Sequence, residues 1–238
     1  MLSKRALVAS LVTSACIALA AGAQAQTEYS LEPAPPLASV RAPDGLVSLL
    51  DPQGSRLVHN VQGKKDPIAD VWWVKSAPAI KPTDTAPDIL VNNLAVGTLV
   101  GLLQFDSPDA EDARDQKIKP GLYTMRYGQI PQDGNHMGVS QYRDFLLLSP
   151  VAADTQYDKV LSFNDLVNVS RKTTGTGHPA VFFVNPANPA YKKLPAVVAD
   201  DQGNCSIQVD LHETGPSGPE DVQFELLLVT PPKESGGS

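Results

Sequence analysis

Proline and glycine divide this chain into short apolar runs, and this division limits the folds open to it more than any other feature. There are 21 prolines and 17 glycines among 238 residues, and many of them lie between runs rich in Val, Leu and Ile. Short runs separated by turn-forming residues are typical of all-β proteins. We therefore predict an antiparallel β-sandwich, of jelly-roll or Ig-like type, or a barrel, in preference to an α/β fold.

Three runs carry clear strand patterns. Residues 68–75 contain Trp72 and Trp73 in succession. Because neighbouring side chains on a strand point to opposite faces, only one of these rings should lie in the core. Residues 97–105 are almost entirely apolar, as expected of a strand covered on both faces. Residues 122–127 alternate, and we expect a core face of Tyr123, Met125 and Tyr127, with Leu122, Thr124 and Arg126 on the other face.

Two further patterns indicate a hairpin and a helix. The runs 46–50 and 56–61 flank a turn that contains Pro52 and Gly54, which predicts a β-hairpin. Ser162, followed three residues later by Asp165, is close to a capping box. We therefore expect one short helix near residues 162–172, packed on the sheet.

The N-terminal segment has the parts of a secretory signal peptide. Two cations precede an apolar run at residues 6–20, and Ala23-Gln24-Ala25 is a small-x-small cleavage motif. We predict cleavage after Ala25, which removes residues 1–25 and leaves a periplasmic or secreted protein. The apolar run is short for an uncleaved anchor, which needs about 20 residues. No membrane attachment is therefore expected after cleavage.

The remaining chain is predicted to contain one domain. Residues 26–43 are rich in Pro and Ala, which favours an extended leader. Residues 231–238 are predicted to form a disordered tail, so that a single β-sandwich domain occupies residues 44–230. Cys205 would be the only cysteine of the mature chain. Stability must then come from a hydrophobic core, because no intramolecular disulfide can form.

Charge and missing motifs exclude several function classes. The formal net charge is −7, which argues against nucleic acid and anionic membranes, because both are bound through clusters of Lys and Arg. The sequence also contains no phosphate-binding loop, nucleophile elbow, HExxH zinc motif, paired cysteines or blue-copper pattern.

Two glycine-rich loops hold the side chains best suited to chemistry. Residues 133–138 include Asp133, Asn135 and His136, Arg143 follows, and residues 175–179 include His178. We predict that these residues form a ligand-binding site: Asp133, Asn135, His136, Arg143 and His178. Loops on β scaffolds often carry function, but Asp, Asn and Gly also build ordinary tight turns.

If the two loops lie at the same end of the domain, His136, His178 and Asp133 could bind a divalent transition metal. An open coordination position would then allow the metal to activate water. In another arrangement, His136 acts as a general base and Arg143 binds an anionic group.

The stretch KPGLYTMRYG…PQDGNHMG…YRDFLLLSP, followed by LSFNDLVNVSRKTTGTGHPAVFFV, resembles an uncharacterised family of secreted bacterial proteins of unknown function. The resemblance covers residues 118–184. It implies a secreted, β-sandwich-like domain, and it implies no activity, cofactor or site residue.

Two hypotheses follow from these observations. The favoured one is a secreted or periplasmic, non-catalytic module without a cofactor, which binds an unknown protein, glycan or small ligand. The alternative is a metal-binding protein or metal-dependent hydrolase that uses His136, His178 and Asp133. The position of the two histidine loops relative to each other distinguishes the hypotheses.

Overall fold

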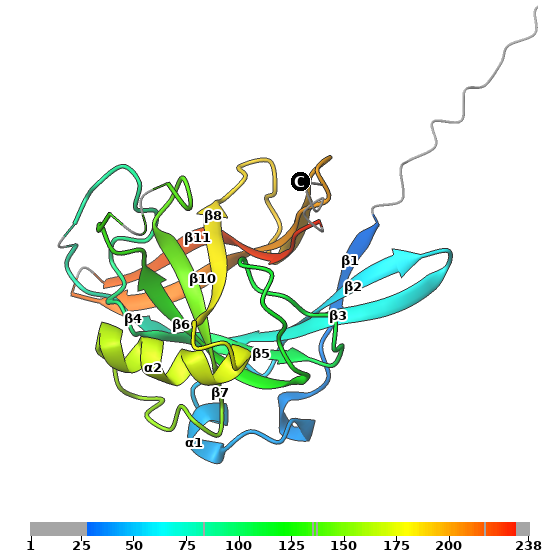
Figure 1. Ribbon diagram of the computed structural model, residues 1–238, viewed down its shortest axis with the longest axis horizontal. Coiled ribbons are helices and arrows are strands. Elements are labelled where there is room, and N and C mark those ends of the chain that lie inside the picture. The colour runs from blue at the N-terminus through cyan, green and yellow to red at the C-terminus, as the bar shows by residue number, and fades with distance from the viewer. Residues whose placement is uncertain (1–27, 83, 135, 137, 217, 232–238) are drawn as a thin grey trace, which may run out of the picture.

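The computed structural model describes residues 28–82, 84–134, 136, 138–216 and 218–231 (Figure 1). The predicted signal peptide, residues 1–25, lies outside the described residues, and so do residues 232–238 of the predicted tail. None of the helices in the described part of the chain has the length and apolarity needed to cross a lipid bilayer.

The described residues form eleven strands in one sheet. The strands are β1 (Tyr29–Pro33), β2 (Ser55–Val61), β3 (Lys64–Trp73), β4 (Ala77–Pro78), β5 (Leu99–Phe105), β6 (Gly121–Gln129), β7 (Asp144–Pro150), β8 (Ala180–Pro186), β9 (Ala196–Ala199), β10 (Cys205–Gly215) and β11 (Gly218–Val229). The helices are the 3-10 helix η1 (Leu37–Ser39), α1 (Asp44–Val47) and α2 (Phe163–Thr174).

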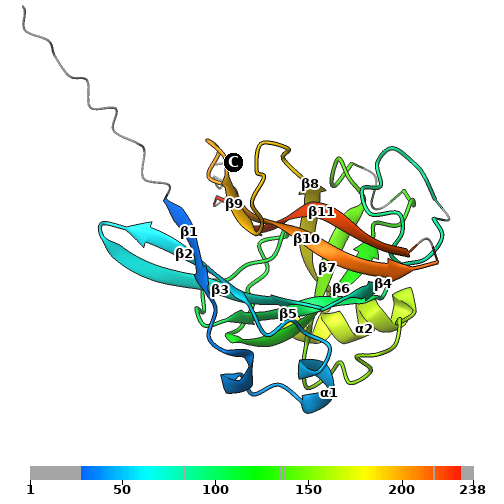
Figure 2. The ribbon, with the colours of Figure 1, turned by 180° about the vertical axis from the view of Figure 1, so that it is seen from behind.

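The strands follow the order β1-β2-β3-β5-β6-β7-β8-β11-β10-β4, and β9 pairs with β10 beside this path. Neighbours are antiparallel, except for the parallel pair of β10 and β4. The sheet curls into a nearly closed, barrel-like arrangement (Figures 1 and 2). The prediction of an all-β fold is therefore confirmed.

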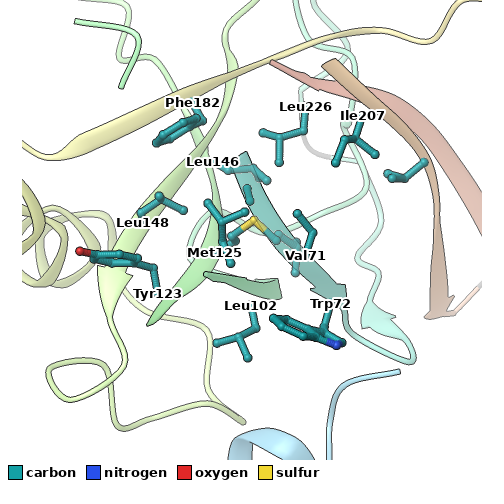
Figure 3. Packing of buried hydrophobic residues seen from close by; sticks show 14 of the residues in the cluster. Val71, Trp72, Leu102, Tyr123, Met125, Leu146, Leu148, Phe182, Ile207 and Leu226 are labelled. Atoms are coloured by element: carbon teal, nitrogen blue, oxygen red, sulfur yellow. The ribbon is translucent and has the colours of Figure 1, made fainter. Parts of the chain in front are cut away.

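The interior of the curled sheet holds the main hydrophobic core (Figure 3). Met125 lies near its centre, between Leu146 and Val71. Trp72 is fully buried on the opposite face of β3, the face that it shares with Leu102 of β5. Trp73 is half-buried on the interior face and packs edge-on against Phe224, with ring centroids 5.8 Å apart. The two rings point to opposite faces, as predicted, but both pack against core residues. The predicted core face of β6 is also buried, with Tyr123, Met125 and Tyr127 facing inward.

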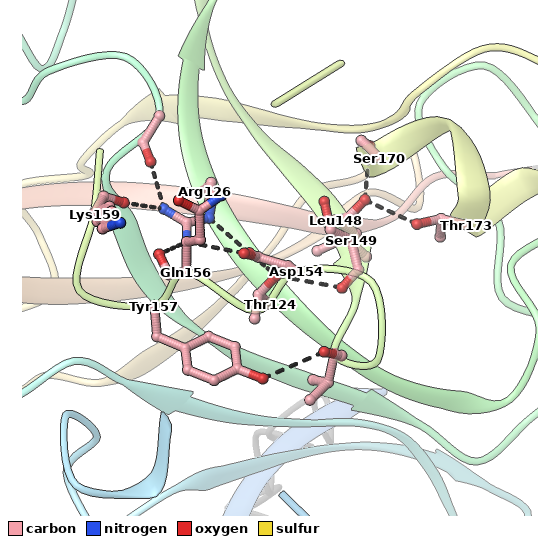
Figure 4. A network of polar contacts seen from close by, with 12 residues as sticks. Thr124, Arg126, Leu148, Ser149, Asp154, Gln156, Tyr157, Lys159, Ser170 and Thr173 are labelled. Atoms are coloured by element: carbon pink, nitrogen blue, oxygen red, sulfur yellow. Dashed lines mark hydrogen bonds and ion pairs between the residues drawn. The ribbon is translucent and has the colours of Figure 1, made fainter. Parts of the chain in front are cut away.

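The opposite face of β6 is buried too, which the alternation pattern did not predict. Thr124 and Arg126 are fully buried, and Arg126 forms an ion pair with Asp154 (Figure 4). Arg126 Nε lies 2.6 Å from Asp154 Oδ2, and Arg126 Nη2 lies 3.0 Å from Asp154 Oδ1. The remaining guanidinium N–H groups donate to the backbone carbonyls of Gly97, Gln156 and Lys159. The loop after β7 thus covers this face, and together with the Gly97 carbonyl it supplies partners for every donor of the arginine.

The predicted hairpin of runs 46–50 and 56–61 is wrong. Residues 44–47 form α1, and the hairpin joins β2 to β3 instead. Its tip is Gln62–Gly63, and both residues have positive φ, at 49° and 78°. A two-residue turn of this kind matches the twist of the two strands that it joins. Residues 64–67 therefore belong to β3 and pair with β2.

The segment predicted to be an extended leader packs on the sheet from Tyr29 onward, so this prediction is wrong. β1 pairs with β2 along its whole length, from Tyr29 opposite His59 to Pro33 opposite Ser55. The Tyr29 and His59 rings stack with centroids 4.8 Å apart, and Leu37 of η1 is buried. Pro33 is compatible with this strand because an edge position does not require its missing N–H.

The predicted helix near residues 162–172 is confirmed as α2. The Ser162 hydroxyl accepts a hydrogen bond from the backbone N–H of Asp165, and Gly175 ends the helix in the left-handed conformation, at φ 70°. α2 lies against the outer face of the sheet (Figure 1). Ser170 and Thr173 donate hydrogen bonds to the Leu148 carbonyl of β7, at 2.6 and 2.9 Å, and hold the helix there.

Candidate functional site

A second apolar cluster lies on the outer face of the sheet, beneath α2. Strand β7 is apolar on both faces: Leu146 and Leu148 point into the interior, whereas Phe145 and Leu147 point outward. The outward cluster comprises Ile130, Phe145, Leu147, Leu161, Leu166 and Val181. α2 covers only part of it. The uncovered part forms a cavity of about 420 Å³, which we call the α2 cavity.

The α2 cavity has an apolar floor and a polar rim. Its floor consists of outward-facing side chains of β7 and β8, namely Phe145, Leu147, Val181 and Phe183. One wall is α2, through Phe163, Val167 and Arg171. Small-molecule sites typically have volumes of about 300–1,000 Å³ and few polar groups. Both the size and the lining of this cavity fall within that description.

The structure brings three of the five predicted site residues to this cavity. Asp133, His136 and His178 all line it, so the two histidine loops lie at the same end of the domain. His136 Nδ1 lies 2.6 Å from Asp133 Oδ1. Asn135 lies outside the described residues.

The fourth described residue, Arg143, lies in a neighbouring hollow of about 380 Å³ that shares His136 with the α2 cavity. Its side chain donates to the Ile130 carbonyl at 3.0 Å and pairs with Asp84 at 3.2 Å. Its backbone N–H donates to the Asp88 carbonyl. These contacts join the loop before β7 to residues 84–88, and they position Arg143 as a structural residue of the loop.

Asp144 fixes the base of the same loop. Its fully buried carboxylate accepts hydrogen bonds from the backbone N–H groups of Leu90 and Val91, at 2.8 and 3.0 Å, and from the Tyr127 hydroxyl at 2.7 Å. Burial, together with the neighbouring Asp144 charge, raises the pKa of Tyr127 above its ordinary value. Tyr127 therefore stays protonated and acts as a hydrogen-bond donor in this network.

Backbone conformation and short hydrogen bonds determine the position of His178. Gly175 and Gly177 both have positive φ, at 70° and 86°, which reverses the chain directly after α2. The Thr174 hydroxyl donates to the His178 carbonyl at 2.7 Å, and the Thr176 hydroxyl donates to the Gln116 side chain. The loop is thus fastened at both ends, and the His178 ring stays exposed at the cavity.

A buried aspartate attaches the segment of Arg114 to the same region. The Asp112 carboxylate accepts hydrogen bonds from the backbone N–H groups of Arg114, Gln116 and Val181, at 2.9, 3.0 and 3.1 Å. This carboxylate therefore connects residues 112–116 to the start of β8. As a result, Arg114 lines the α2 cavity together with the helix residue Arg171.

The sequence did not identify Arg114 and Arg171 as site residues. Arg114 belongs to a stretch rich in Asp and Glu, and Arg171 has the usual position of a cation near a helix C-terminus. No local signal marks them, because segments distant in the sequence bring them to one cavity.

The described residues contain no group of three or more His, Cys, Asp or Glu side chains that could hold a metal ion. His136, His178 and Asp133 share a cavity, but they are not gathered into such a group. The single described cysteine is also unsuited to chemistry, because burial raises the pKa of Cys205 to about 12 and leaves the thiol protonated and inert.

Comparison with protein-family models, with curated proteins and with solved structures gave no match. The resemblance of residues 118–184 to secreted bacterial proteins therefore remains a prediction, and the function must be argued from the geometry of the site.

Proposed function

We propose that this protein is a non-catalytic binding module that takes a small ligand with an apolar body into the α2 cavity. Among the partner classes that the sequence leaves open, protein, glycan and small ligand, the cavity favours the last. Apolar floors with a few convergent polar groups are typical of small-molecule sites, whereas glycans require many hydrogen-bonding groups.

The observation that carries this proposal is the incomplete cover of an apolar surface. β7 presents Phe145 and Leu147 on its outer face, and α2 leaves part of this surface open. Val139 and Phe163, which are 49% and 36% exposed, stand beside the opening. Apolar side chains that line a concave site are typical of places where small ligands bind.

The lining also favours binding over catalysis. The described residues of the α2 cavity include no Ser, Thr, Tyr, Cys or Lys side chain that could act as a nucleophile. The Asp133–His136 pair is the described group best placed to move a proton. Both residues lie near the rim of the cavity. We infer that their hydrogen bond stabilises the loop and that their side chains contact the ligand.

The cellular location and the detailed architecture belong to the same proposal. The signal peptide predicted at residues 1–25 supports a periplasmic or secreted protein. Two apolar faces, one inside the curled sheet and one under α2, are compatible with a sandwich of jelly-roll or Ig-like type.

A neutral fluorescent probe, N-phenyl-1-naphthylamine, tests the binding function without any charged group. We expect its fluorescence to rise when it binds the mature protein. Val167→Trp should abolish the rise, because Val167 lines the cavity and an indole would fill it. Lys172→Trp is the matched control, because Lys172 is an exposed α2 residue outside the cavity lining. Equal binding by both variants would reject the proposed site.

The alternative function, a metal-binding protein or metal-dependent hydrolase, rests on one observation: His136, His178 and Asp133 line the same cavity. The two loops would have to move to gather these side chains around one ion. Elemental analysis of protein purified from the periplasm tests this function, beside the His136→Ala, His178→Ala double variant. Equal metal content in the two proteins would reject it.

A further inference from the structure

We propose that the ligand of the α2 cavity is an amphipathic anion, an apolar chain or ring system that carries one carboxylate. This inference rests on the binding function proposed above and names its ligand class. The apolar floor favours a ligand with an apolar body, and the charged residues of the lining favour a head group of negative charge.

The charge of the cavity lining opposes the charge of the chain. The chain carries a formal net charge of −7. The titratable lining residues are two arginines, two histidines and one aspartate: Arg114, Arg171, His136, His178 and Asp133. The lining is therefore positive even with both histidines neutral. A cationic site on an acidic surface attracts anions locally and repels cations.

The cationic groups are free to bind a head group. Within the part of the chain that the structure describes, the Arg114 and His178 side chains have no hydrogen-bond or ion-pair partner, and both residues are exposed. Arg171 makes one long hydrogen bond, 3.3 Å to the Asn168 side chain on its own helix. By contrast, the acid of the lining, Asp133, is already engaged by His136.

The positions of the two arginines explain why a carboxylate fits. Arg171 stands on the last turn of α2, and the Asp112 carboxylate holds the backbone N–H of Arg114 on a different segment. Two separate segments thus bring cationic side chains to the cavity. A guanidinium binds a carboxylate through two parallel N–H···O bonds. The apolar body would then cover Phe145 and Val181 on the floor, which an inorganic anion would leave exposed to water.

Three ligands with the same ten-carbon chain test the inference: decanoate, decanol and decyltrimethylammonium. Each is used below its micelle concentration to displace N-phenyl-1-naphthylamine from the full mature protein. We expect decanoate to bind about tenfold or more tightly than decanol, as the gain of a charge-assisted hydrogen bond implies. The ammonium compound should bind more weakly than both.

Substitutions test whether Arg114 and Arg171 cause the preference for decanoate over decanol. The Arg114→Gln, Arg171→Gln double variant should lose about tenfold or more in decanoate affinity while its decanol affinity stays unchanged. Lys172→Gln is the matched control, because Lys172 is the next helix cation and does not line the cavity. It should leave both affinities unchanged.

The outcomes separate this inference from the function on which it rests. If decanol binds as tightly as decanoate, the anionic class is wrong and the binding function stands. If the double variant keeps its decanoate preference, the assignment to Arg114 and Arg171 is wrong. If neither the fluorescent probe nor any ligand binds, the proposed function itself fails.

Discussion

The Arg126–Asp154 ion pair provides the sharpest test of how this fold is held together. Arg126→Met removes the guanidinium and keeps an apolar side chain of similar length. Asp154 would then remain buried, with the Thr124 hydroxyl, 2.7 Å away, still donating to it. Removing one member of a buried ion pair destabilises a protein by about 3–5 kcal/mol, since the other charge is left without compensation.

That loss is large beside the total stability of a typical domain, about 5–15 kcal/mol. The loop of residues 151–161 leads directly into α2, and Arg126 holds it through the carbonyls of Gln156 and Lys159. We therefore expect Arg126→Met to weaken binding of the fluorescent probe as well as to lower stability, because the helix wall of the cavity loses its support.

Urea denaturation followed by tryptophan fluorescence measures the change, since Trp72 is buried in the core. Lys65→Met is the control, because Lys65 pairs with Glu32 on the exposed surface, and such pairs contribute about 0–1 kcal/mol. Adding Asp154→Leu to Arg126→Met should recover part of the stability, because no unpaired charge is left. A loss below about 1 kcal/mol for Arg126→Met would refute the argument.

Three further predictions concern other parts of the fold. Burial raises the pKa of Glu213 to about 7, above the value near 4.3 of an unfolded chain. The protonated carboxyl group therefore stabilises the folded state fully at pH values below about 4. As the pH rises from there through about 7, the unfolded chain loses this proton first, and the free energy of unfolding should fall by on the order of 3 kcal/mol. Glu213→Gln should remove this decline, and equal pH profiles of unfolding in both proteins would contradict it. A Cβ atom at Gly128 would lie 2.3 Å from the Phe145 ring, so Gly128→Ala should displace the cavity floor, lower stability by about 1–3 kcal/mol and weaken probe binding in fluorescence titrations. Unchanged binding would show that the Phe145 ring is not part of the floor. Ser162→Ala removes the N-terminal cap of α2 and should lower the urea midpoint by the equivalent of about 1 kcal/mol. Ser162→Thr should preserve the cap, because its hydroxyl can still accept from the Asp165 N–H and donate to the Asp165 carboxylate.

The sequence predicted those features that depend on neighbouring residues alone. Alternation identified the inward face of β6, and the spacing of Ser162 and Asp165 identified the start of α2. The two histidine loops were recognised from their glycines and polar side chains, and both reach one cavity.

Features that depend on long-range contacts were not predictable in the same way. Alternation placed Arg126 on the face opposite Tyr123, Met125 and Tyr127, and it gave no sign that the loop after β7 folds back over that face. Arg114 and Arg171 line one cavity only because α2 and the loop before β6 both reach it. The Pro-rich segment at residues 26–43 resembled a leader, because edge pairing tolerates residues that a central strand would exclude.

The pairing of β1 with β2 has a consequence for the behaviour of the protein in concentrated solution. Without β1, the long β2–β3 hairpin would present an unpaired row of backbone groups to other molecules, and such edges recruit further strands into aggregates. β1 covers that row and is itself short, with Glu32 and Pro33 at its end. A charge and a proline at an edge hinder the addition of another strand. Removal of residues 26–43 would therefore expose a strand edge that favours self-association, and it would also take Tyr29 and Leu37 out of the core.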